Sequence, residues 1–127
     1  MEFMTGLSIN TKIYDILKND AKLGELCKSI YPLVAEEDVK FPFILFSRTS
    51  VRPIDTKTCI AGDNVTFDIV IVSDKYKLGI NIAERLRQLF EKRRDSYFRE
   101  VNMTGCTEGF GDNAYVQTLS FSATILN

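Results

Sequence analysis

Histidine and tryptophan are absent from this sequence of 127 residues, and only three prolines and three cysteines are present. Without histidine, the usual Ser-His and Cys-His nucleophile pairs cannot form. Cys27, Cys59 and Cys106 are odd in number and their spacing fits no zinc or redox motif, so we expect free thiols, buried or half-buried, in a reducing compartment. We therefore predict no metal site, no cofactor and no enzymatic activity.

A strong net charge and long apolar runs are also missing. The formal net charge is −1, so the composition gives no general attraction to nucleic acid or to an acidic membrane. No apolar run approaches the roughly 18 residues of a membrane span, and the N-terminus lacks the layout of a signal peptide. With 45% hydrophobic and 26% charged residues, the chain has the composition of a single globular domain over residues 1–127.

The most regular pattern is a strand over residues 65–73 followed by a helix over residues 78–90. Apolar side chains alternate along the strand, and Val70 and Val72 make its second half apolar on both faces, so we expect both faces to be covered there. Asp74 is the expected N-cap of the helix, in which apolar residues recur at every third or fourth position.

Two helices and an edge strand are expected upstream. The helices span residues 7–19 and 21–29, and Asp20 caps the second; alternatively, the first helix continues through this region with a kink. Pro32 restricts the strand-like segment over residues 30–34 to an edge or a bulge, because proline cannot donate to a neighbouring strand.

The apolar run Phe41-Pro42-Phe43-Ile44-Leu45-Phe46 predicts a strand whose two faces are both apolar and must both be covered. The protein core is the more common cover for such a run, and an interface is the alternative. The strand continues to residue 51 and forms a hairpin with residues 65–73, across a long connection over residues 55–64.

The C-terminal part predicts a strand near residues 98–103, a glycine-rich turn over residues 105–113 and a clearly alternating strand over residues 115–125. All the elements together predict an α+β fold, with a largely antiparallel sheet of about four to five strands and helices packed on one face.

Three features have both a functional and a structural interpretation. Cys106 lies beside a glycine in the expected turn, but no base is near it in the sequence, which favours a structural thiol over a nucleophile. The acidic run over residues 36–38 is typical of a solvated loop and not of an acid–base pair facing a cleft. The basic run over residues 92–94 fits the C-terminal end of a helix better than a phosphate-binding patch.

In this order, the segments resemble the tail-completion proteins of tailed bacteriophages, which are also described as minor tail, head–tail joining or tail-terminator-like proteins. The resemblance rests on a short helical start before Ile30-Tyr31-Pro32, an acidic loop, the strand Phe41-Pro42-Phe43-Ile44-Leu45-Phe46, the strand over residues 65–73, the helix over residues 78–90 and the closing strand over residues 115–125. These are packing patterns, and they include no catalytic residue.

The resemblance implies a structural virion protein that forms a ring, such as a hexamer, at the head-proximal end of the tail tube. It implies contacts with copies of itself, with the tail-tube protein and with the head-connector protein, while DNA passes through the lumen without sequence-specific binding. It also implies a place in the virion tail, assembly in the cytoplasm of a bacterial host and no contact with a membrane.

A ring joins one surface patch of each subunit to a different patch of the next, so it needs apolar surface beyond the core. We expect Phe41, Phe43 and Phe46 to supply this surface, with Arg52 and Ile54 extending it towards a neighbour. The competing interpretation is a small α+β module that binds a ligand or a peptide without catalysis. Concentration-dependent assembly would distinguish the two.

Overall fold

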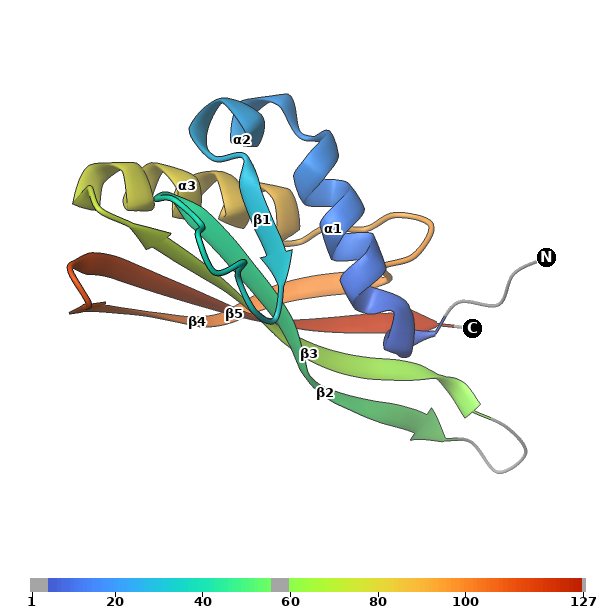
Figure 1. The fold of residues 1–127 in the computed structure, drawn as a ribbon. Coiled ribbons are helices and arrows are strands. Elements are labelled where there is room, and N and C mark those ends of the chain that lie inside the picture. The colour runs from blue at the N-terminus through green and yellow to red at the C-terminus, as the bar shows by residue number, and fades with distance from the viewer. Residues whose placement is uncertain (1–4, 56–59, 127) are drawn as a thin grey trace.

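The computed structural model describes residues 5–55 and 60–126, which form two layers (Figure 1). One layer is a β-sheet, and the other consists of helices that lie on a single face of that sheet: α1 (Ile9–Asn19), α2 (Ala21–Leu26) and α3 (Tyr76–Phe90). This arrangement confirms the predicted α+β class with helices on one face.

Five strands form the sheet within the described residues, in the order β1-β2-β3-β5-β4. Their bounds are β1 (Ser29–Pro32), β2 (Phe43–Asp55), β3 (Ile60–Ser73), β4 (Glu100–Gly111) and β5 (Ala114–Leu126). Neighbouring strands are antiparallel except for β1, which pairs with β2 in the parallel direction. The order makes β3 the central strand and places β1 at an edge, where Pro32 is tolerated as predicted.

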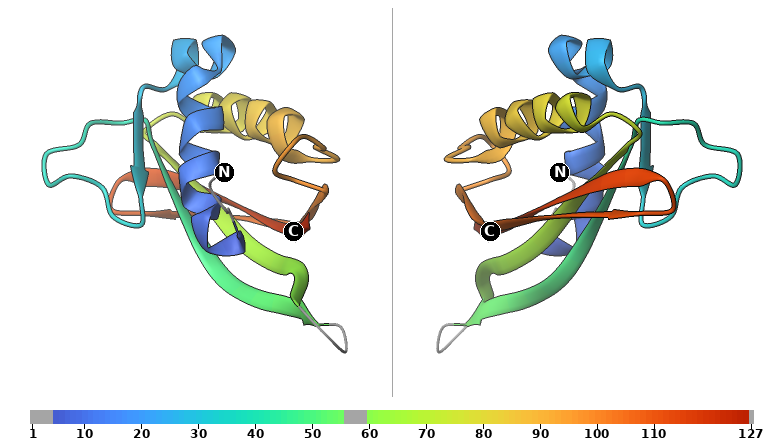
Figure 2. Two further views of the ribbon diagram at one scale, coloured as in Figure 1. Left: turned by 90° about the vertical axis from the view of Figure 1, so that its right-hand side faces the viewer. Right: turned by 90° about the vertical axis from the view of Figure 1, so that its left-hand side faces the viewer.

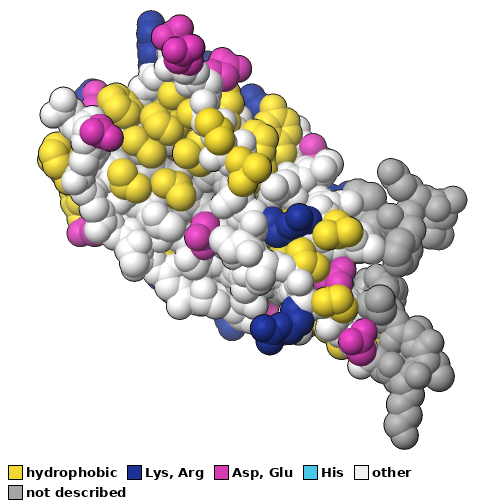
Figure 3. Space-filling view, turned by 60° about the horizontal axis from the view of Figure 1, so that its bottom comes forward, with side chains coloured by type: hydrophobic (Ala, Val, Ile, Leu, Met, Phe, Trp, Pro, Cys, Tyr) yellow, Lys and Arg dark blue, Asp and Glu magenta, His cyan; other side chains and the backbone are white. Residues whose placement is uncertain are grey.

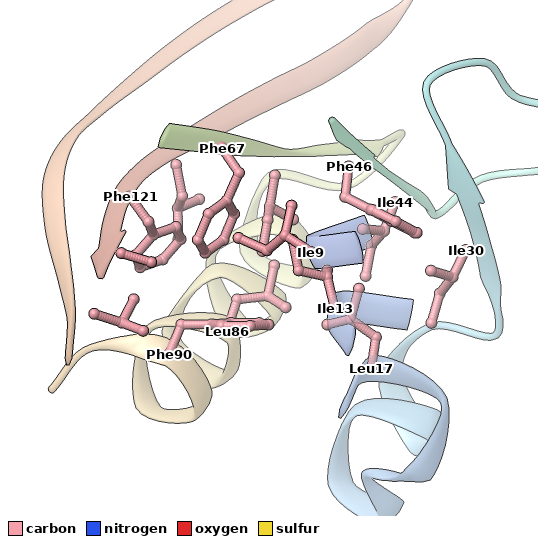
Figure 4. Packing of buried hydrophobic residues seen from close by; sticks show 14 of the residues in the cluster. Ile9, Ile13, Leu17, Ile30, Ile44, Phe46, Phe67, Leu86, Phe90 and Phe121 are labelled. Atoms are coloured by element: carbon pink, nitrogen blue, oxygen red, sulfur yellow. The ribbon is translucent and has the colours of Figure 1, made fainter. Parts of the chain in front are cut away.

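The core lies between the sheet and the helices (Figure 4). The buried side chains come mainly from α1, α3 and the three central strands, and they include Ile9, Ile13, Leu17, Ile44, Phe46, Phe67, Leu86, Phe90 and Phe121. Phe67, Phe90 and Phe121 meet with ring centroids between 5.2 and 5.7 Å apart, in the stacked and edge-to-face arrangements that aromatic rings prefer. This cluster holds α3 on β3 and β5.

The first two helices begin and end through local contacts. A 3₁₀ turn, η1 (Gly6–Ser8), precedes α1, so the first α-helix starts slightly later than predicted. Asp20 caps α2 as predicted, because its carboxylate accepts a hydrogen bond from the Leu23 N–H at 2.9 Å. The helix ends at Leu26, before the predicted end, and a separate α2 replaces the kinked alternative.

The predicted cap of α3 by Asp74 is wrong. Lys75 occupies the N-cap position and provides no side-chain hydrogen bond. Instead, the Ser73 hydroxyl accepts from the Lys75 N–H at 3.1 Å and donates to the Lys75 carbonyl at 2.9 Å. This contact turns the chain directly out of β3, so the helix begins earlier than predicted.

The β2–β3 hairpin is confirmed, but the long connection predicted over residues 55–64 is wrong. The two strands continue through most of it, and residues 56–59, which include Cys59, lie outside the described part of the chain. Asp63 looks like a turn residue in the sequence, yet it is buried in β3 and accepts the Gly6 N–H at 2.8 Å. A tertiary contact therefore overrides the local preference.

The glycine-rich turn predicted over residues 105–113 is also wrong, because β4 extends through most of it by pairing with β5. The turn is confined to Asp112 and Asn113, whose φ angles of 51° and 62° are those of a two-residue hairpin turn of type I′. Cys106 therefore lies in a strand and is exposed, contrary to prediction, whereas Cys27 is buried as predicted.

Candidate interaction surface

The face of the sheet opposite the helices has no covering element among the described residues (Figures 1 and 2). Apolar side chains gather at one end of this open face (Figure 3). We call this group the open-face patch; its members are Phe41, Phe43, Leu45, Val70, Val72 and Val116.

Strand pairing explains why these residues form one surface. Phe43 is paired with Val72 and Leu45 with Val70, and Val72 is in turn paired with Val116 on the other side. Residues paired across neighbouring strands share a face, so their side chains are adjacent. The strand members are half-buried, and they are continuous with Phe41, which precedes β2.

The prediction that both faces of β2 and of the end of β3 are covered is therefore wrong for the single subunit. The helices cover one face, and the other remains open to solvent. Phe41 is 43% exposed, and its ring stacks on Phe43 at a centroid separation of 5.9 Å. A grouped apolar surface of this kind is typical of an interaction site, unlike single exposed apolar residues.

Four of the five predicted interface residues lie on the open face, and one does not. Phe41 and Phe43 belong to the open-face patch, and Arg52 and Ile54 lie farther along β2 on the same side. Phe46 faces the helices, is 1% exposed and packs near Tyr14 of α1. Phe46 is therefore a core residue of the subunit, and it does not belong to the open-face patch.

A β-bulge brings the two groups of predicted residues onto one face. Phe43 has an odd number and Arg52 an even one, so a regular strand would place them on opposite faces. The register shifts between Arg48 and Ser50, because Thr49 is an additional residue on β2. Beyond this bulge, the even-numbered residues of β2 face the open side.

Sequence patterns alone did not identify Leu45, Val70, Val72 and Val116 as surface residues. The sequence does indicate a second apolar surface, because Val70 and Val72 are apolar residues on the face of β3 opposite its core-facing residues. They were expected to be covered within the subunit, and only the one-sided placement of the helices shows that they are not.

The charged groups near the end of α3 serve structural contacts. Arg93 donates to the Leu89 carbonyl at 3.2 Å and to the Asp95 carboxylate at 2.7 Å, and Lys92 donates to Asn102 at 2.8 Å. These contacts fit the helix-end interpretation of the basic run, because Arg93 satisfies the Leu89 carbonyl in the last turn of the helix.

Titratable groups elsewhere are also tied into the fold. Burial raises the pKa of Tyr97 to about 12, and its hydroxyl donates to the Thr5 carbonyl. Hydrogen bonds from Gln117 and Tyr76 lower the pKa of Glu108. In the described ranges, no three metal-ligating side chains converge, and no described helix is both long and apolar enough to span a bilayer.

Comparison with protein families decides the classification. The family described as Tail completion protein gp17 matches residues 11–106. The chain belongs to this family. The match runs from α1 into β4 and so includes the open-face residues of β2 and β3.

Solved structures show that the fold is shared with a phage-like particle. A chain from the "Virion of native gene transfer agent (GTA) particle" aligns with a TM-score of 0.76 and 14% identity, over 91% of this chain and 92% of that chain. A second solved chain, identified only by a sequence label, aligns with a TM-score of 0.54 and 13% identity, over 95% and 94% of the two chains. The comparison with curated proteins gives no match.

Family membership supports a structural role in a phage virion, at the tail, in association with other virion proteins. It also favours a non-enzymatic protein. The open-face patch is then the surface through which such contacts are to be sought.

Proposed function

We propose that this member of the tail-completion family closes the tail tube as a ring and joins it to the head connector. In this role it contacts copies of itself, the tail-tube protein and the connector, and DNA passes through the lumen without being read. The observation that carries the proposal is the open-face patch, an apolar area that the helices of the subunit leave uncovered.

Cyclic assembly gives the open-face patch a function that a monomer does not. In a ring, a surface of each subunit meets a different surface of the next, and apolar area removed from water stabilises that contact. The acidic loop over residues 36–38 precedes Phe41 in the sequence, and Asp68 lies on the open face next to Val70 in the alternation of β3. An apolar centre with charged residues around it is the usual anatomy of a protein interface.

Arg52 and Ile54 extend the contact away from the patch. They lie on the part of the β2–β3 hairpin that projects beyond the helices (Figure 1). A projecting strand pair can reach a neighbouring subunit without moving the core. We therefore propose that both residues contact the neighbouring subunit.

The substitution Phe43→Asp tests the ring. The aspartate adds a charge at the centre of the open-face patch, where burial against a neighbour would be costly, but it leaves the core on the other face of β2 intact. We expect a folded monomer by circular dichroism and light scattering, at concentrations at which the wild-type protein assembles alone or on tail tubes.

Leu7→Asp is the matched control, because Leu7 is 67% exposed and lies outside the open-face patch. This variant is expected to assemble like the wild type. Intact rings formed by the Phe43→Asp variant would remove the open face from the subunit contact.

A small ligand-binding module is the second candidate function, and a groove between α1 and β1 of about 660 Å³ favours it. This volume lies within the range of small-molecule sites. A protein that stays monomeric at all concentrations and on tail tubes, and that a metabolite stabilises against heat, would establish this function in place of the ring.

A further inference from the structure

The groove between α1 and β1 lies at the β1 edge of the sheet and has an apolar floor, with two lysines and Glu36 among its exposed lining residues. Phe46 and Ile30 contribute to the floor, and Lys18 and Lys28 contribute exposed ammonium groups. Asn10 also lines the groove, and its buried Oδ1 atom has no hydrogen-bond partner among the described residues. A buried acceptor without a partner is costly, so an incoming N–H donor would stabilise the groove.

A rigid aromatic projection lies at the opposite edge of the sheet, at the tip of the β4–β5 hairpin (Figure 1). We call it the β4–β5 knob; its members are Tyr76, Phe110, Asp112 and Tyr115. The ring of Tyr115 lies 4.9 Å from that of Phe110 and 5.4 Å from that of Tyr76, measured between centroids. Phe110 is nevertheless 65% exposed, and Asp112 is exposed in the tight turn beside it.

The knob is preorganised for binding. The Tyr76 hydroxyl donates to Glu108 at 2.9 Å, which ties the start of α3 to β4, and Gln117 donates to the same carboxylate oxygen. The two-residue turn fixes the path of the backbone between the strands. Exposed aromatic side chains that are already rigid lose little conformational entropy on binding, which is why they are common at the centres of interfaces.

We propose that the β4–β5 knob of one subunit occupies the α1–β1 groove of the next subunit in the ring. This proposal rests on the proposed ring and specifies which two surfaces meet in it. A knob and a groove at opposite edges of one sheet form a contact between unlike surfaces, as a cyclic assembly requires. A second copy of this chain is therefore the occupant of the groove.

Charge complementarity supports a second copy over a metabolite. Asp112 on the knob meets a groove rimmed by Lys18 and Lys28, and the exposed Phe110 ring matches the apolar floor. In the other direction, Glu36 lines the groove, and Lys75 and Lys77 flank Tyr76 in the sequence. The two lysines of the groove thus face the acidic Asp112 of the knob, and Glu36 can face the lysines beside it.

Cysteine cross-linking tests this contact in the full-length chain. Both proteins carry Cys59→Ser and Cys106→Ser. One also carries Phe110→Cys and the other Lys28→Cys, and the two are mixed under mild oxidation. The mixture is studied alone and on tail tubes, at concentrations at which light scattering detects assembly. We expect disulfide-linked heterodimers in severalfold excess over the homodimers of either variant. The matched control replaces Lys28→Cys with Leu7→Cys, which is exposed but lies outside the groove.

The neutral variant Asp112→Asn tests the charge pairing with Lys18, which the Lys28→Cys partner retains, and it keeps a residue type that tolerates the left-handed turn conformation. Its heterodimer formation is expected to fall by about two- to fivefold, as for a partly exposed ion pair. Heterodimers no more abundant than with the control, in samples that do form rings, would overturn the knob–groove contact and leave the ring standing. If neither rings nor heterodimers form, and a metabolite protects the introduced cysteine of Lys28→Cys from alkylation, both the ring and the knob–groove contact are overturned.

Discussion

At the scale of single residues, Asp20 joins two helices through one carboxylate. It caps α2 by accepting from the Leu23 N–H, and it accepts from two nitrogen atoms of Arg85 on α3 at 2.6 and 2.8 Å. The hydrogen bond from Arg85 lowers the pKa of Asp20. Because the side chain of Asp20 is only 12% exposed, water competes weakly for these bonds.

This linkage predicts a stability difference that depends on pH. The folded pKa of Asp20 lies below its unfolded value of about 3.9, so the ion pair stabilises the fold above that pH and is lost as pH falls through the folded pKa. Asp20→Asn retains a good cap but removes the charge. We expect urea unfolding to show a wild-type advantage at pH 7 that shrinks below about pH 4.

Asp20→Ala is the companion variant, because it removes the cap as well as the charge. It is expected to lose about 1 kcal/mol more than Asp20→Asn at neutral pH, the usual contribution of an N-cap. A wild-type advantage over Asp20→Asn that stays constant from pH 7 to pH 3 would contradict the assigned role of the ion pair.

Sequence patterns located the residues of the core better than those of the surface. Alternation on β3 and β5 identified their buried faces, because most residues that face the helices there are apolar and recur at every second position. The buried polar residues Asp63, Ser73 and Gln117 are exceptions. Phe46 and Phe43 look alike in the sequence, yet one is core and the other surface. Which of the two is buried depends on which face of the sheet the helices cover, and the local sequence does not determine that.

At the scale of elements, the outer half of β4 has a composition that its own subunit does not require. Gly105, Gly109 and Gly111 adopt no positive φ, and a Cβ atom added to any of them would meet no atom within 4 Å. Glycine in a strand lowers its stability, and it often marks a place where another backbone approaches closely. Gly62 on β3 is different, because a Cβ there would collide with the Ile125 carbonyl oxygen.

Two glycine substitutions are therefore expected to change stability in opposite directions. Gly109→Ala should stabilise the isolated subunit by about 0.4–1 kcal/mol, since it restricts the unfolded chain without a clash in the fold. Gly62→Ala should destabilise it by about 1–3 kcal/mol, because the backbone of β5 must move. Urea unfolding of both variants measures the two effects, and equal losses would show that β4 is more closely packed than its geometry indicates.

The elements differ in how far sequence predicts them. The α1 and α3 helices and the β3 and β5 strands follow from hydrophobic periodicity, which reports burial directly. The outer half of β4 was interpreted as a turn because glycine favours turns, and only pairing with β5 makes it a strand. The parallel pairing of β1 with β2 and the bulge at Thr49 depend on tertiary register, so no local pattern indicates them.

At the scale of the whole molecule, the described residues of one subunit leave three candidate contact surfaces open. A sheet covered by helices on one side buries only one of its faces. The open-face patch occupies the other face, and the knob and the groove lie at the two edges. The resemblance to tail-completion proteins could be recognised from the order of the segments in the sequence. These surfaces could not be predicted in the same way, because they depend on the strand register and on which face of the sheet the helices cover.

Hydroxyl-radical footprinting of the free protein and of the protein in assembled tails tests the whole arrangement at once. If the ring forms through these surfaces, oxidation of Phe43 and Phe110 falls on assembly, because neighbouring subunits cover both rings. Phe67 and Phe121 are 0% exposed and serve as internal controls that stay unreactive in both states. Protection of Phe43 alone would support the open face and count against the knob, while unchanged oxidation of Phe43 would show that the open-face patch stays in contact with water in the tail. The measurement thus separates the two contacts, because each has its own aromatic reporter on a different part of the sheet.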